Sequence, residues 1–155
     1  MRSGRRLAVD VGKVRVGLAI SDFHGILASP LQNIARQADD QVTVAALIDA
    51  IAGETIIEAY FGLPVSMSGK PSQSTEDAIS LASLFAATSS IPVRMIDERL
   101  TTVSAAAALR SSGKNSKDGR KVIDQIAATM ILEQALATEK NSGNQPGVSL
   151  GELNV

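Results

Sequence analysis

The chain of 155 residues contains no cysteine and a single histidine, His24. The absence of thiols excludes disulfide frameworks, thiolate metal sites and cysteine nucleophiles, and one imidazole excludes a histidine-rich metal site. Aromatic residues make up 3% of the chain, so aliphatic side chains must fill the core and stacking of bases on aromatic platforms is not expected. The candidates for chemistry are therefore the acids.

The chain also lacks a long hydrophobic run. The first apolar run, residues 7–9, follows three arginines and is interrupted by Asp10, so neither a signal peptide nor a membrane span is expected. We therefore predict a cytoplasmic protein with no membrane partner. The net charge of −1 argues against a dedicated, strongly basic nucleic-acid binder.

Positive charge is nevertheless concentrated in residues 110–121, against the single acid Asp118. The basic residues are Arg110, Lys114, Lys117, Arg120 and Lys121. This excess could hold phosphates, or it could belong to a solvated loop that leads into a helix.

The length and composition indicate one domain. Hydrophobic residues make up 45% and charged residues 20% of the chain, as in a soluble globular protein. We predict a single domain over residues 1–138. Residues 139–155 are rich in Asn, Ser and Gly, a composition that buries little surface, and we expect a flexible C-terminal tail.

The hydrophobic pattern predicts an α/β fold with a five-stranded mixed sheet flanked by helices. Strands are expected at residues 7–11, 14–20, 27–34, 55–61 and 92–96, with a close turn at Gly12-Lys13 and with Pro30 restricting the third strand to an edge or a bulge. Helices are expected at residues 44–51, 74–88 and 101–109, followed by a last helix with its apolar stripe over residues 123–131. Ser74 and Asp77 are interpreted as the capping pair of the second helix. Ligands of such sheets collect at the strand ends where the strand order reverses.

Three acids stand apart from ordinary surface charge. Asp10 lies on a predicted strand, where an acid is disfavoured, although it could also cap a turn amide before Gly12. Glu98 follows the strand at residues 92–96, and strand alternation places Asp97 and Glu98 on opposite faces. Asp124 borders the apolar stripe of the last helix, where it could equally be a first-turn partner of the helix dipole.

Carboxylates that converge at one sheet edge repel each other unless a cation lies between them. Mg²⁺ or Mn²⁺ is the natural cation for ligands that are all oxygen. Such ions activate water and stabilise the attacking and leaving oxygens at phosphorus, which is the two-metal route to phosphodiester cleavage. Neighbouring basic residues would then hold the substrate backbone.

Four motifs in order resemble the bacterial YqgF family, also called RuvX, of RNase H-like nucleases. They are Asp10-Val-Gly-Lys-Val-Arg15-Val-Gly17, Gly62-Leu-Pro64 with Gly69, Asp97-Glu98-Arg99-Leu-Thr-Thr102, and Asp124 followed by Gln-Ile-Ala-Ala-Thr-Met-Ile-Leu. The resemblance covers about residues 7–136. It implies an RNase H-like fold and a metal-dependent hydrolase of phosphodiester bonds that matures the 5′ end of pre-16S ribosomal RNA, acting on precursor RNA and ribosomal particles.

Site residues carried over by motif position are of two kinds. Asp10, Glu98 and Asp124 are implied as catalytic and metal-binding acids for Mg²⁺ or Mn²⁺. Phosphate contacts are expected from Arg15, Arg99, Lys114, Lys117, Arg120 and Lys121. Two residues depart from the family pattern: Val65 stands where a polar or basic residue is common, and Glu133 stands where glutamine is usual.

Three other functions are also compatible with the sequence. The family has also been linked to Holliday-junction resolution, which needs two active sites and hence a symmetric dimer, whereas trimming of single-stranded RNA does not, so both a monomer and a homodimer are compatible. Asp-x-Gly after a first strand also opens ATPase domains, but those enzymes close two such domains around the nucleotide. A non-catalytic RNA-binding module in ribosome assembly is the third, because every acid named above has a structural alternative.

Overall fold

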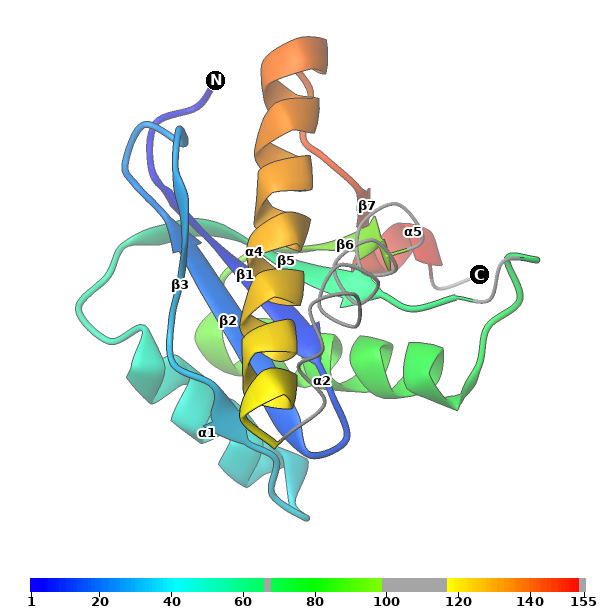
Figure 1. Cartoon of the computed structure of the whole chain (residues 1–155). Helices are drawn as coiled ribbons and strands as arrows, with labels where there is room; N and C mark the ends of the chain where they lie inside the picture. The colour runs from blue at the N-terminus through cyan, green and yellow to red at the C-terminus, as the bar shows by residue number, and fades with distance from the viewer. Residues whose placement is uncertain (66–67, 99–116, 154–155) are drawn as a thin grey trace.

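The computed structural model of the chain describes residues 1–65, 68–98 and 117–153, with the backbone alone for residues 117–124. A mixed sheet of seven strands forms its centre, in the order β3-β2-β1-β5-β6-β7, with β4 paired to β2 off this path. The strands are β1 (Arg5–Val11), β2 (Arg15–Ser21), β3 (Ala28–Pro30), β4 (Ile34–Ala35), β5 (Ile56–Leu63), β6 (Val93–Asp97) and β7 (Val148–Ser149). The helices are α1 (Asp40–Ala50), α2 (Gln73–Ser89), α4 (Lys117–Ser142) and α5 (Leu150–Leu153) (Figure 1). The predicted mixed sheet flanked by helices is confirmed.

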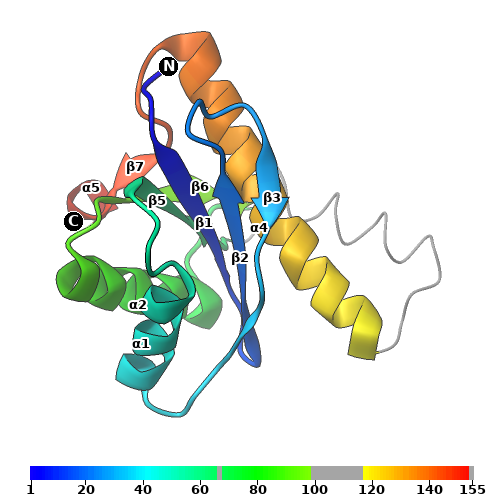
Figure 2. The same ribbon diagram turned by 90° about the vertical axis from the view of Figure 1, so that its left-hand side faces the viewer.

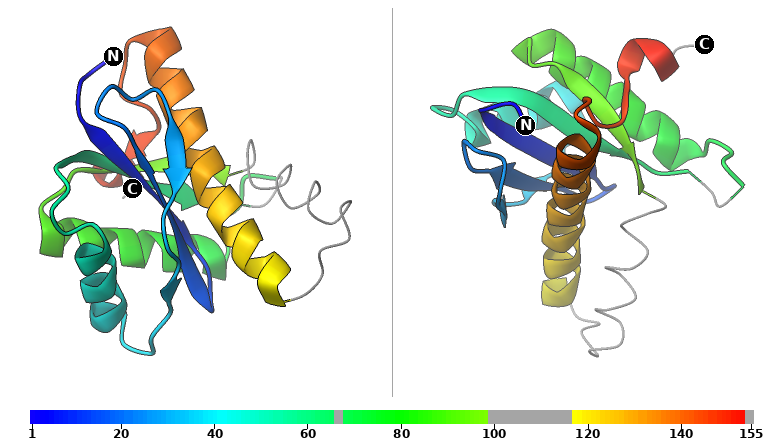
Figure 3. Two further views of the ribbon diagram at one scale, coloured as in Figure 1. Left: turned by 60° about the vertical axis from the view of Figure 1, so that its left-hand side comes forward. Right: turned by 90° about the horizontal axis from the view of Figure 1, so that it is seen from above.

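Helices cover both faces of the sheet. In Figure 2, α1 and α2 lie on one side of the strands and α4 lies on the other, and the view from above in Figure 3 shows the same layers. Strand alternation explains the division, because successive side chains point to opposite faces. Leu7 and Val9 of β1 pack in the core on the α1 and α2 side, whereas Ala8 packs with Ile131 and Leu132 of α4.

Strand β1 lies in the middle of the sheet, where the direction of the chain connections changes. It pairs antiparallel with β2, with Asp10 opposite Gly17, and parallel with β5, with Val9 opposite Phe61. Strand β6 continues the parallel part beyond β5, with Gly62 opposite Ile96. The carboxyl ends of β1, β5 and β6 therefore meet at one edge of the sheet, where α/β folds bind their ligands.

The prediction of five strands is wrong in two places. The strand expected at residues 27–34 is two short strands, because between the pairs Ala19–Pro30 and Val16–Ile34 three residues of this segment face two residues of β2. The extra residue breaks the ladder as a β-bulge does, which agrees with the bulge or edge position expected from Pro30. Strand β7 was not predicted, because two residues within a polar segment carry no alternating pattern.

Side-chain caps begin the first two helices. Asp39 accepts a hydrogen bond from the backbone N–H of Gln41 at the start of α1. Ser72 is the N-cap of α2 and forms a capping box with Thr75. The predicted capping pair, Ser74 and Asp77, is therefore wrong. The helix predicted at residues 101–109 lies outside the described residues. Across the described part of the chain, no helix is both long enough and apolar enough to span a membrane.

The C-terminal segment differs from the flexible tail predicted for residues 139–155. Helix α4 extends to Ser142, and Glu139 on its last turns is buried. Beyond it, Val148 of β7 pairs with Met95 on the edge of β6. Arg94 holds this segment further by donating hydrogen bonds from Nε to the Pro146 carbonyl at 2.6 Å and from Nη2 to the Gly147 carbonyl at 2.8 Å. Backbone pairing and one arginine therefore fix a segment that has little apolar surface of its own.

Replacing Gly147 by alanine should detach this segment from β6. Gly147 has a φ of +69°, and a Cβ there would lie 2.3 Å from the Met95 carbonyl oxygen, whereas Gly143 has a φ of +74° and no atom within 4 Å. Gly143→Ala should cost about 1 kcal/mol, the price of a left-handed alanine. Gly147→Ala should cost about 1–3 kcal/mol more, because its neighbour is rigid backbone. Urea denaturation measures both losses, and equal losses would contradict the packing of residues 144–149 on β6.

Candidate active site

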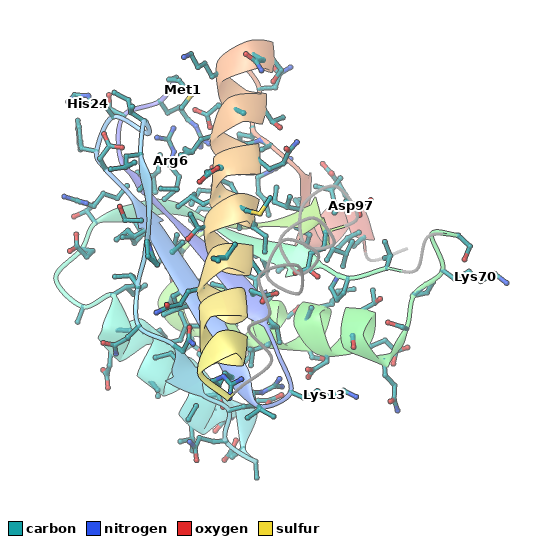
Figure 4. The ribbon with its side chains drawn as sticks, viewed as in Figure 1. Met1, Arg6, Lys13, His24, Lys70 and Asp97 are labelled. Carbon is teal, nitrogen blue, oxygen red and sulfur yellow. The ribbon has the colours of Figure 1, made fainter. Side chains whose placement is uncertain are left out.

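On the face of the sheet that α4 covers, the side chains of β1 change from charged to apolar and back to charged along the strand. At the amino end of β1 the buried side chain is Arg6, in the middle Ala8 and Tyr60 form an apolar layer, and at the carboxyl end the side chain on this face is Asp10. Figure 4 shows Arg6 and Lys13 at opposite ends of the sheet. An acid at the open end of a strand, beyond an apolar layer, is mounted on rigid backbone.

Asp10 and Glu98 lie on either side of Gly62. Continuing the β1–β5 register by one residue from Val9–Phe61 places Asp10 beside Gly62, at the strand spacing of about 4.8 Å. Glu98 follows β6 directly, and its side chain lies over Gly62, with Oε1 2.2 Å from the position that a Cβ on Gly62 would occupy. Alternation along β1, β5 and β6 places all three residues on the face covered by α4. The two carboxylates therefore lie on one face of the sheet, on neighbouring parts of its edge.

Asp97 and Glu98 lie on opposite faces, as alternation predicted. Asp97 ends β6, opposite Leu63 of β5, two residues after the buried Met95 on the α1 and α2 side. Glu98 lies two residues after Ile96, which packs against α4. Of this pair, Glu98 is the residue placed toward Asp10.

The remaining predicted site residues are described less completely. Asp124 is in α4, one turn before Ala128, which packs on the sheet, and its side chain is outside the described part of the structure. Three basic residues, Lys117, Arg120 and Lys121, are in the first turns of α4, and only their backbone is described. Arg99 and Lys114 lie outside the described residues. Arg15 begins β2, opposite Ala35. The roles assigned to these residues stay predictions.

The donor set at this edge fits a hard divalent cation. Asp10 and Glu98 offer carboxylate oxygens, which Mg²⁺ and Mn²⁺ prefer. Among the side chains that the structure describes, no three Asp, Glu or His residues form a metal-binding group, so a third protein ligand would have to come from elsewhere. Helix α4 brings Asp124 to the same face of the sheet as a candidate for that ligand.

A clamp that no sequence motif indicates holds the hairpin that follows Asp10. Arg36 donates from Nη1 to the Gly12 carbonyl at 3.0 Å and to Asp77 Oδ2 at 2.9 Å, and from Nη2 to Asp77 Oδ1 at 2.7 Å. Its backbone N–H also donates to the Val14 carbonyl at 2.9 Å. The hydrogen bonds to Asp77 raise the pKa of Arg36 further above its ordinary value, while the same contact lowers the pKa of Asp77. Arg36 thus fixes residues 12–14 to α2, directly beyond Asp10.

Removing this clamp should lower stability moderately. The Arg36 side chain is 11% exposed and its partner Asp77 is 35% exposed, so we expect Arg36→Met to cost about 1–2 kcal/mol. The matched control is Arg5→Met, because Arg5 and Glu54 form an ion pair with both side chains more than 40% exposed and worth less than about 1 kcal/mol. Chemical denaturation of both variants measures the difference. A smaller loss for Arg36→Met than for Arg5→Met would contradict the clamp.

Comparison with known sequences identifies the family. The profile of the RuvX family, described as Holliday junction resolvase, matches residues 4–138. The chain belongs to the RuvX family. A relative from Clavibacter sepedonicus is 47% identical over 147 residues, covering 95% of this chain and 91% of the relative. Another from Streptomyces coelicolor is 44% identical over 148 residues, covering 95% of this chain and 88% of the relative. Both carry the name "Putative pre-16S rRNA nuclease".

Solved structures support the fold. RuvC of Thermus thermophilus in complex with a Holliday junction substrate superposes with a TM-score of 0.57 at 14% sequence identity, covering 92% of this chain and 99% of that chain. A second Thermus thermophilus RuvC structure gives a TM-score of 0.52 at 12% identity, covering 89% of this RuvX chain and 97% of the other. The RNase H-like fold expected from the motifs is therefore confirmed.

Proposed function

We propose that this RuvX protein is a metal-dependent nuclease that hydrolyses phosphodiester bonds in the 5′ maturation of pre-16S ribosomal RNA. The observation that carries the proposal is the pair of carboxylates, Asp10 and Glu98, placed on one face across Gly62 at the carboxyl ends of parallel strands. Membership of the RuvX family and relatives with nuclease names support the reaction class.

In this proposal Asp10 and Glu98, with Asp124 from α4, hold Mg²⁺ or Mn²⁺. The bound ion supplies an activated water and stabilises charge on the phosphate oxygens. The protein contributes geometry, because Asp10 is fixed by strand pairing with Gly17 and the hairpin beyond it is held by Arg36. Because the backbone around Asp10 is fixed, its carboxylate would not have to reorganise during the reaction.

The substrate backbone is held by basic groups around this edge. Arg15 lies on β2, the strand next to Asp10, and Lys13 is exposed at the hairpin tip. Lys117, Arg120 and Lys121 belong to the first turns of α4, and in the sequence Lys114 precedes them and Arg99 follows Glu98. Contacts to phosphate fix the register and orientation of the protein on the nucleic acid, but they do not distinguish one base sequence from another.

The proposed function is tested by offering two substrates side by side. Precursor 16S RNA with its 5′ leader and a four-way DNA junction are incubated with the full chain in Mn²⁺, and the product ends are mapped. We expect cleavage of the RNA in the leader and no faster cleavage of the junction than of linear duplex. Symmetric nicks in the junction without RNA cleavage would replace the proposal by junction resolution, the activity in the RuvX family description.

A third outcome would replace both enzymatic functions. Binding of precursor RNA that needs no metal, is unchanged in Asp10→Asn and leads to no cleavage would identify a non-catalytic RNA-binding module. The midpoint of the binding curve with and without EDTA provides this readout in the same experiment.

A further inference from the structure

Glu98 occupies the space above Gly62 in which any other residue would have a side chain. A Cβ on Gly62 would lie 2.2 Å from Oε1, 2.7 Å from Cδ and 2.8 Å from Cγ of Glu98. Approaches under 3.0 Å are essentially never seen for real Cβ atoms. The whole outer part of the glutamate side chain therefore lies against the bare backbone of β5.

Backbone conformation does not explain a glycine at this position. Gly62 is a buried residue inside β5, paired with Ile96, and it is not among the residues with positive φ. Glycine within a strand weakens the strand, and it often marks a site where another group approaches closely. The group that approaches Gly62 is a carboxylate of the same chain.

We propose that Gly62 is a positioning residue of the active site, and that its missing side chain sets the carboxylate of Glu98 beside Asp10. Gly62 lies on the middle one of the three strands, between Asp10 on β1 and Glu98 after β6. Because β5 separates β6 from β1, the Glu98 side chain must lie across β5 for its carboxylate to point toward β1. This inference rests on the proposed metal-dependent function.

An alanine at residue 62 would move Glu98 without unfolding the sheet. The atoms it meets belong to the end of a flexible side chain, which can rotate away, in contrast to the Met95 carbonyl oxygen that faces Gly147. The damage is therefore concentrated on the metal site. Because groups that orient ligands typically contribute about 10- to 100-fold to metal affinity, Gly62→Ala should raise the Mn²⁺ dissociation constant by about that factor.

A double-mutant cycle tests the contact itself, in EDTA and without any metal. The four proteins are wild type, Gly62→Ala, Glu98→Ala and the double variant, and the readout is the urea midpoint of unfolding. Gly62→Ala should lower the midpoint when Glu98 is present and leave it unchanged, or raise it, when residue 98 is alanine. Gly151→Ala is the matched control, because a Cβ there meets only Ser149 Oγ at 4.0 Å, and it should neither lower the midpoint nor change Mn²⁺ binding.

Two results would overturn the inference. One is an equal effect of Gly62→Ala on the midpoint in both backgrounds, and the other is wild-type Mn²⁺ affinity in Gly62→Ala, measured by calorimetry. If wild type and Asp10→Asn bind Mn²⁺ equally, the proposed metal site fails instead, and the cycle in EDTA still decides whether Gly62 sets the position of Glu98.

Discussion

Asp10→Asn should lower the rate of RNA cleavage at saturating Mn²⁺ by at least about 1000-fold, which corresponds to about 4 kcal/mol of lost transition-state stabilisation. In the proposed site the Asp10 carboxylate is a charged oxygen ligand at the edge where Glu98 also lies, and an amide of the same shape removes its negative charge. Asp10 pairs with Gly17 through the backbone, which the substitution leaves intact. The fold should therefore survive while catalysis fails.

Single-turnover cleavage and RNA binding measured on the same preparation separate these effects. The dissociation constant for precursor RNA should change little, because in the proposal basic residues supply most of the contacts to phosphate. The control is Asp49→Asn, an exposed acid on α1, on the opposite side of the sheet, which should cleave as wild type does. Cleavage by Asp10→Asn within tenfold of wild type, taken as about 1.4 kcal/mol, would remove Asp10 from the site.

Glu139→Gln should produce the largest loss of stability, about 3–5 kcal/mol, because it leaves a buried charge without its partner. Glu139 Oε2 accepts hydrogen bonds from Arg6 Nη2 at 2.8 Å and from the Arg2 backbone N–H at 3.0 Å. The Arg6 side chain is 0% exposed and that of Glu139 is 4% exposed, so water cannot replace the missing carboxylate. Glu54→Gln, in an ion pair that is exposed at both ends, is the matched control and should change stability by less than about 1 kcal/mol. Losses of similar size in the two variants, measured by urea denaturation, would contradict the buried network.

The same carboxylate predicts a pH dependence. Burial opposes ionisation of Glu139, but the hydrogen bonds from Arg2 and the charge of Arg6 outweigh burial and lower its pKa to about 2. A carboxyl group with a lowered pKa in the folded state stabilises the protein above its unfolded pKa of about 4.5, and this contribution is lost as the pH falls toward 2. Stability measured from pH 6 downward should therefore fall more steeply in wild type than in Glu139→Gln. Parallel curves would contradict this assignment.

The sequence was sufficient for the parts of the fold that depend on local pattern. The β1–β2 hairpin follows from two β-rich runs around Gly12, and the positions of Asp10 and Glu98 follow from the ends of apolar strands. The opposite faces of Asp97 and Glu98 follow from alternation alone. These features need no knowledge of distant residues.

The features that sequence reasoning missed depend on distant partners. Glu139 lies at the start of a polar segment whose composition predicts a flexible tail. Its carboxylate accepts a hydrogen bond from Arg2, which is 137 residues away in the chain. Arg36 and Asp77 are 41 residues apart, and nothing in either neighbourhood marks them as a pair. The close approach of the Glu98 side chain to Gly62 likewise joins residues that are 36 positions apart in the chain. Long-range contacts between polar residues leave no periodic trace in a sequence.

The metal dependence of cleavage by the wild-type chain tests whether carboxylates at the ends of β1 and β6 act through a divalent cation to cut RNA. Precursor 16S RNA is incubated with the protein in EDTA and then at increasing Mn²⁺ concentrations. We expect no cleavage in EDTA and a rate that rises with Mn²⁺ and saturates. Cleavage that persists in EDTA at the full rate would contradict this expectation.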